Sequence, residues 1–139
     1  MAILSKIKEI CNSAVPEYGF EFEHSKMMNV KADNASFPLI FFEEYTDGKI
    51  TQQMGLKKAV MVELSFMRLC PMHNDAADRE MLREQIESEA ILPFIKKLQE
   101  SQYFEPVKEF SCMPEPPRFD ANAVSVMLRF WVTYRMCAQ

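Results

Sequence analysis

The last residues of the chain, 123–139, read AVSVMLRFWVTYRMCAQ. Between residues 124 and 136 every second residue is apolar, a period that is typical of a β-strand with one face on a protein core. Thirteen residues in a strand span about 43 Å, whereas a compact domain of this length is about 37 Å across. The sequence therefore predicts a long final strand that bends or projects beyond its own domain.

The residues between these apolar positions form a second face of the final strand. They are Ser125, Met127, Arg129, Trp131, Thr133, Arg135 and Cys137. Tryptophan and arginine are enriched in binding hot spots, so we expect Arg129, Trp131 and Arg135 to contact another protein chain. The alternative is that Trp131 packs under a neighbouring arginine as a surface cation–π pair. In either case Glu43 and Glu63, on neighbouring strands, are placed to pair with the arginines.

A hairpin is expected upstream, in FPLIFFEEYTDGKITQQMG (residues 37–55). Asp47-Gly48 stands between two extended runs, and glycine accepts the positive φ that a tight hairpin turn requires. The expected hairpin tip, Thr46, Asp47, Gly48 and Lys49, joins the predicted contact surface. Pro38 lacks a donor N–H and therefore fits the first position of a strand or a sheet edge.

Three further segments have the pattern of strands. Residues 20–30 indicate an edge strand, and residues 103–113 indicate a short strand before a proline-rich loop that begins at residue 114. Residues 56–70 alternate strictly between apolar and other side chains. The apolar face of this run consists of Val60, Val62, Leu64 and Phe66.

Two segments have helical periodicity. Residues 3–14 carry one apolar stripe, and Pro16 and Gly19 end that helix. Residues 75–101 carry a second stripe, with Pro93 inside it, where we expect a kink or a break. The stripe of this second helix consists of Leu82, Ile86, Ala90, Phe94 and Leu98.

The order of these segments is a helix, about four strands, a helix and two strands. Strands that come in runs, and do not alternate with helices, predict an α+β fold with a mostly antiparallel sheet of four to six strands. Both helices are expected on one face of the sheet. A chain of 139 residues suits one domain, which we expect to span residues 1–139.

Composition narrows the classes of function. The net charge is −4, from 20 acidic and 16 basic residues, which argues against nonspecific nucleic-acid binding. No apolar stretch reaches the roughly 18 residues of a membrane helix, and the N-terminus lacks the uncharged core of a signal peptide. We therefore expect a cytoplasmic protein without a membrane or nucleic-acid partner. Its four cysteines are expected to be free thiols, mostly buried.

The sequence offers little catalytic chemistry. Cys70 and His73 have the spacing of two zinc ligands, but a structural zinc site needs four and the other cysteines are scattered singly. A cysteine nucleophile needs a nearby base and an oxyanion hole, and none of the three glycines flanks a cysteine. There is no glycine-rich phosphate-binding loop. We therefore expect no metal, no cofactor and no enzymatic activity.

The layout of the chain resembles a known family. A short N-terminal helix, a strand beginning at Phe37-Pro38 that leads into a hairpin, the long strand around residues 60–66, the helix at 75–101 and the final strand follow one another. This order is similar to that of the tail-terminator and tail-completion proteins of long-tailed bacteriophages and prophages, over most of the chain. The proline-rich stretch at 114–117 and the hairpin at 45–51 are not features of that family.

The resemblance implies a non-enzymatic structural role. Such proteins form a ring, usually a hexamer, on the end of the tail tube and contact head-completion proteins. It implies a homo-oligomer that meets tail-tube and head-completion proteins in the host cytoplasm and in the virion. Two alternatives stay open: a small ligand-binding or regulatory module with an apolar pocket between helix and sheet, and a thiol or metal enzyme built on Cys70 and His73.

Overall fold

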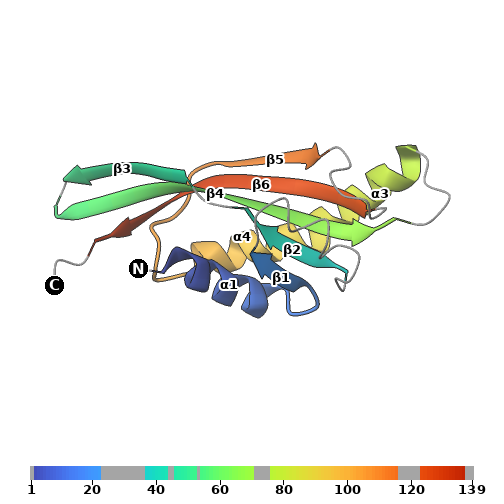
Figure 1. Cartoon of the computed structure of the whole chain (residues 1–139), viewed down its shortest axis with the longest axis horizontal. Helices are drawn as coiled ribbons and strands as arrows, with labels where there is room; N and C mark the ends of the chain where they lie inside the picture. The colour runs from blue at the N-terminus through green and yellow to red at the C-terminus, as the bar shows by residue number, and fades with distance from the viewer. Residues whose placement is uncertain are drawn as a thin grey trace.

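The computed structural model describes residues 2–22, 37–43, 46–52, 54–70, 76–115 and 123–136. The elements in chain order are α1 (Ile3–Ala14), β1 (Gly19–Phe22), β2 (Leu39–Phe42), β3 (Thr46–Gln52), β4 (Leu56–Leu69), α3 (Ala76–Ile86), the π-helical turn η1 (Glu87–Ile91), α4 (Leu92–Gln99), β5 (Phe110–Glu115) and β6 (Ala123–Arg135). This is the predicted order, and the predicted α+β class is confirmed (Figure 1).

The six strands form one sheet in the order β1-β2-β4-β6-β5, and β3 also pairs with β4. β2 pairs with residues 64–67 of β4 and β3 with residues 56–61, so the two strands lie end to end along the same edge of β4. Every pairing is antiparallel except that of β1 with β2. The edge strand expected at residues 20–30 is confirmed for residues 20–22, which lie in β1, and residues 23–30 lie outside the described part of the chain. The parallel pairing of β1 with β2 was not predicted.

The core follows from the register of β4 and β6. These strands pair from Lys57↔Arg135 to Leu69↔Ala123, which brings their apolar rows side by side. The rows pack against α1 and α4 on one face of the sheet, as predicted. Phe94 of α4 lies at the centre, with ring centroids 6.0 Å from Phe66 and 5.7 Å from Phe130.

The second helix is interrupted where Pro93 predicts a break. The π-helical turn η1 comes directly before α4, and Pro93 lies in the first turn of α4. The helical path continues through this point, since Ile91 and Leu92 keep right-handed helical angles and Leu92 N–H donates to Glu87 O. The expected kink or break is therefore one π-helical turn beside the proline. Ala90 and Ile91 in the π turn, together with Phe94, remain buried against the sheet.

One end of the sheet extends past the helices (Figure 1). β5 begins at Phe110, opposite Phe130. Beyond that point the sheet narrows to β3, residues 56–61 of β4 and residues 131–135 of β6. We call these three segments the arm. The final strand therefore projects, as its length predicts, and it does so together with two partners.

Two predicted turns are wrong. Asp47-Gly48 is not the hairpin turn: Asp47 pairs with Val60 and Lys49 with Ala59, which leaves Gly48 in a bulge inside β3. The chain reverses instead near Met54-Gly55, where φ is 54° and 108°. The predicted loop at residue 114 is also wrong at its start, because β5 continues through Pro114 and Glu115. β5 is an edge strand, and an edge tolerates the missing N–H of proline.

Candidate interaction surface

The sheet face opposite the helices carries the predicted contact residues. We call it the open face. The cross-strand pairs place Met61 beside Trp131, Glu63 beside Arg129 and Ser65 beside Met127. Methionine, tryptophan, carboxylate and arginine side chains thus lie in one row along β4 and β6, which begins at the base of the arm with Met61 and Trp131 and runs toward the β2 end of the sheet.

At the β2 end, the side chains of the open face are buried. Leu39, Phe41 and Met67 are fully buried there and form a second small core with Phe37. The sequence analysis did not predict this second core. The signal was present in the sequence, because four consecutive apolar residues in β2 indicate a strand that is buried on both faces.

Trp131 marks the exposed part of the open face. The side chain is 51% exposed. Its ring lies over the bulge at Gly48, where an added Cβ would come within 2.5 Å of Trp131 Cζ3 and within 1.9 Å of the Ala59 carbonyl oxygen. Among the described residues the cation–π contacts are made by Lys6 and Arg68 with tyrosines, so the alternative of an arginine-capped indole is not observed.

A shallow hollow of about 390 Å³ adjoins the indole. It is lined by Trp131 and Thr133 on one side and by residues 105–109 on the other. These residues run along the edge of β6 beyond β5, held by a hydrogen bond from Glu105 N to Thr133 O of 2.8 Å. The indole thus has one face on its own sheet and an edge toward an open depression.

Arg129 is engaged within its own chain. Its Nε lies 3.3 Å from Glu63 Oε1, which is an ion pair with the carboxylate that the sequence suggested as a partner. The contact lacks the geometry of a hydrogen bond. Burial raises the pKa of Glu63, and although Arg129 opposes this, a hydrogen bond with Glu43 and the nearby charge of Glu115 raise it further. The pair with Glu63 leaves the Arg129 guanidinium less available to a partner than the Trp131 indole.

The remaining predicted contact residues belong to the arm. Lys49 and Arg135 are exposed, and Gly48 lies beneath the indole. The side chains of Thr46 and Asp47 lie outside the described part of the structure. The arm carries several basic residues. One of them, Lys57, lies opposite Arg135, and its ammonium forms an ion pair with the Glu105 carboxylate at 2.6 Å. Trp131, Lys49 and Arg135 are thus brought onto one projecting element, while Arg129 lies at its base.

Sequence reasoning missed the apolar end of the arm. Ile50, Met54 and Leu56 are all exposed around the β3–β4 turn. Ile50 is 57% exposed although it lies in a strand, opposite Lys58. Three apolar side chains within seven residues of a turn were the available signal, and the misplaced turn at Asp47-Gly48 hid it.

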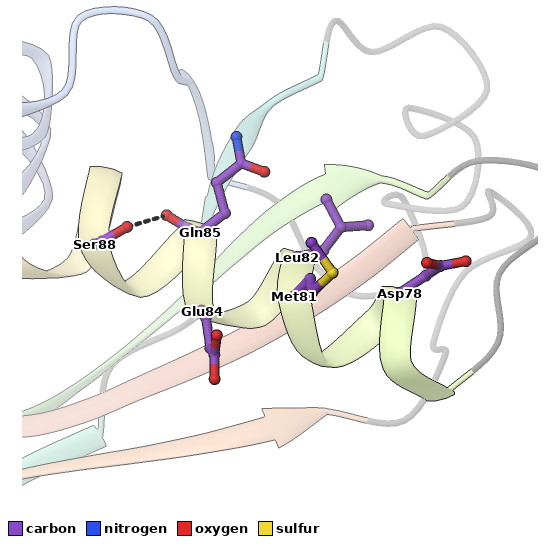
Figure 2. A pocket seen from close by; sticks show the side chains of 6 residues that line it. All are labelled: Asp78, Met81, Leu82, Glu84, Gln85 and Ser88. Atoms are coloured by element: carbon purple, nitrogen blue, oxygen red, sulfur yellow. Dashed lines mark hydrogen bonds between the residues drawn. The ribbon is translucent and has the colours of Figure 1, made fainter.

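A second hollow lies on α3, at the other end of the molecule (Figure 2). Its volume is about 700 Å³, and it is lined by Asp78, Met81, Leu82, Glu84, Gln85 and Ser88. Figure 2 shows Met81 and Leu82 between the carboxylates of Asp78 and Glu84. This hollow was not predicted from the sequence, and in α3 only Ile86 is buried while the other side chains are exposed or partly exposed.

A polar cluster fixes the middle of the second helix to the sheet. Glu89 accepts hydrogen bonds from Tyr18 Oη at 2.6 Å, from Arg68 Nε and from Gln85 Nε2 at 3.2 Å. Burial alone would raise the pKa of Glu89, but these hydrogen bonds outweigh it and lower the pKa. Every partner in this cluster is internal, so we interpret it as a structural clamp.

The structure describes only some of the cysteine and histidine residues that the sequence analysis considered. Cys11 and Cys70 are buried and Cys112 is exposed, all as free thiols. Burial raises the pKa of Cys11, and partial desolvation of the sulfur together with the neighbouring Glu87 carboxylate raises the pKa of Cys112, so neither is an activated nucleophile. His73 and the fourth cysteine, Cys137, lie outside the described residues. Within the part that the structure describes, no three histidine, cysteine, aspartate or glutamate side chains come together as a metal-binding group.

No helix in the described ranges is both long enough and apolar enough to span a membrane. The chain matches no model of a known protein family and no curated protein.

Proposed function

We propose that this chain is a non-enzymatic structural subunit that self-associates, of the tail-terminator or tail-completion type of long-tailed phages and prophages. The observation that carries the proposal is the half-exposed indole of Trp131 at the base of an arm that projects past the helices. The order of the elements supports the assignment to this type of protein. Its partners would then be further copies of itself, tail-tube protein and head-completion protein, in the host cytoplasm and the virion.

The arm is suited to binding another chain because it is already ordered. β3, β4 and β6 pair through backbone hydrogen bonds along the arm, so its side chains are held before any partner arrives. A preorganised surface loses less conformational entropy on binding than a flexible loop does. The arm exposes both apolar side chains and basic side chains, the two kinds of residue that protein interfaces combine.

The ligand-binding alternative is less well supported. It requires an apolar pocket between helix and sheet, lined by methionine and phenylalanine. The described side chains in that position, among them Phe66, Phe94 and Phe130, pack on one another and are buried. The two hollows near Trp131 and on α3 lie on the surface of the molecule instead. No observation favours a small-molecule ligand over a protein partner.

Sedimentation velocity from micromolar to millimolar concentration, with negative-stain electron microscopy of the same samples, tests the proposal. We expect a discrete closed oligomer, in solution or after purified tail tubes are added. A protein that stays monomeric at every concentration and also forms no ring on tail tubes would refute the proposal.

A further inference from the structure

The open face of the arm combines the Trp131 indole with basic side chains. Arg135 lies four residues after Trp131 in β6, and Lys57 is its cross-strand partner in β4, so all three share this face. Lys49 pairs with Ala59, two residues further along β4, and joins them. We call Lys49, Lys57, Arg135 and Trp131 the basic face of the arm.

Two of these cations lie directly opposite each other. Met136 N–H donates to Leu56 O at 2.8 Å, so these two residues form a hydrogen-bonded pair, and the next pair, Lys57 with Arg135, is a non-hydrogen-bonded one. In such a pair the Cα atoms are about 4.5 Å apart and the side chains are at their closest. Like charges in this position destabilise a sheet. The folded monomer therefore holds the two cations together against their repulsion.

The described part of the chain neutralises this charge incompletely. Glu105 pairs with Lys57 at 2.6 Å. Lys49 and Arg135 are exposed, and neither pairs with a carboxylate among the residues that the structure describes. Both lie on the face that bears the half-exposed indole of Trp131. Carboxylates from another chain would therefore relieve the repulsion at the place where that chain also gains apolar contact.

The charge of the arm is opposite in sign to that of the rest of the chain, which we call the body. Of the 16 basic and 20 acidic residues of the chain, the arm has four and one, a net charge of +3. The remaining twelve basic and nineteen acidic residues give the body a net charge of −7. The arm of one copy is therefore electrostatically complementary to the body of another.

This charge distribution determines the kind of contact between two copies. A two-fold contact between the open faces of two arms would bring three cations of each copy together, and like charges disfavour it. A contact between an arm and a body joins two different surfaces instead. It leaves one arm and one body surface free at the ends, so it continues into a closed ring or an open filament.

We propose that the basic face of the arm docks on the acidic body of a second copy, with the Trp131 indole at its centre and Lys49 and Arg135 paired with carboxylates of that copy. This inference rests on the self-association proposed above and specifies the surface that carries it and the charge that it meets. The indole supplies apolar contact, and the cations orient the two copies. A nucleic acid would also meet the −7 charge of the body, which repels it.

Reversing charge on the arm tests this contact. The arm variant combines Lys49→Glu with Arg135→Glu, and the matched control combines Lys96→Glu with Lys97→Glu in α4, outside the arm. All four side chains are exposed, and both double variants change the net charge by the same amount. The arm variant should be at least as stable as wild type in urea unfolding, because Arg135→Glu puts a carboxylate opposite Lys57.

Sedimentation equilibrium at about 50 mM and about 500 mM NaCl measures the contact. We expect the Kd of the wild type to rise at least about tenfold over this range, since salt screens exposed charges. At the lower salt concentration the arm variant should associate at least about tenfold more weakly than wild type, and the control at most about twofold more weakly. If wild type assembles only on tail tubes, the extent of ring formation there replaces Kd in the same comparison.

Mixing the arm variant with wild type tests the direction of the contact. The arm variant keeps an acidic body, which accepts a wild-type arm, but its own arm cannot dock. Substoichiometric amounts are therefore expected to cap the growing assembly and shorten it, whereas the control variant should be incorporated without this effect.

The other outcomes separate this inference from the proposed function. If the wild type associates with a Kd that does not rise with salt, or the arm variant associates as tightly as the control, self-association stands but the basic face does not carry it. An arm variant that leaves the wild-type assembly unshortened refutes docking on the body. A short single-stranded oligonucleotide that binds the arm of a wild type that does not self-associate would assign the face to nucleic acid and overturn the inference. A wild type that neither associates nor forms rings on tail tubes refutes the proposed function as well.

Discussion

Replacing Trp131 with alanine is expected to weaken self-association without unfolding the protein. A tryptophan side chain buries about 150–250 Å² when fully covered. Because 51% of Trp131 remains exposed, about 100 Å² is left to be buried by a partner. At about 25 cal/mol per Å² this area is worth about 2.5 kcal/mol per interface, which corresponds to about a 70-fold increase in Kd.

The chain provides its own probe for this prediction. Trp131 is the only tryptophan in the sequence, so intrinsic fluorescence reports on this one position. We expect the emission maximum of the wild type to shift to shorter wavelength as concentration rises and the indole leaves water. Sedimentation equilibrium of wild type and Trp131→Ala gives the two Kd values. Urea unfolding at low concentration measures what the substitution costs the monomer.

Phe22→Ala is the matched control for this experiment. Phe22 is an aromatic residue of the edge strand β1, 40% exposed, with its ring centroid 5.4 Å from that of Phe42. It lies outside the open face and the arm, so its removal should leave Kd unchanged. An unchanged Kd for Trp131→Ala, or an emission maximum that stays constant while the protein assembles, would show that the indole is not in the interface.

Three further predictions concern the structure that supports this surface. Gly48→Ala should destabilise the protein by more than about 2 kcal/mol in urea unfolding, because a Cβ there would lie 2.5 Å from Trp131 Cζ3 and closer still to the backbone of β4. An Ala variant as stable as wild type would show that the bulge can relax. Phe94→Ala should cost about 3–5 kcal/mol, since its buried ring would leave a cavity; a loss below about 1 kcal/mol would contradict the described core. The folded-state pKa of Glu63 is raised, so its contribution to stability is present at acid pH and is lost as pH rises through the folded pKa. Glu63→Gln should therefore be more stable than wild type at pH 7 and lose this advantage in acid, and a less stable variant at pH 7 would show that the Arg129 pair outweighs burial.

The fold could be predicted from sequence because its main signals are local and periodic. Alternation in residues 56–70 and 124–136 fixes which side chains face the core, and two such strands can only pair with their apolar rows on the same side. The helical stripe of residues 3–14 matches α1 at both ends. Pro93 predicts an irregularity in the second helix because proline has no backbone N–H to donate. This property is local, so no tertiary information was needed.

The features that sequence reasoning missed depend on contacts between distant segments. Gly48 looked like a turn residue because glycine serves equally well in a turn and under a large side chain. Its role is decided by Trp131, more than eighty residues away in the chain. The hollow on α3 was equally hard to predict, since an exposed helix face shows no periodic pattern of apolar residues. Which exposed methionine lies in a hollow depends on how far α3 stands from the sheet.

The arm follows from a difference in length between the two layers. The 12 residues of α1 make a helix of about 18 Å, whereas the 13 residues of β6 extend about 43 Å. The second helical segment, 24 residues from Ala76 to Gln99, spans about 36 Å, so neither helix covers the full length of the strand pair. Val132 and Tyr134 are still buried, because Phe104 and Val107 from the segment after α4 reach that far. Ile50 and Leu56 lie past the last of these contacts, so both side chains stay exposed.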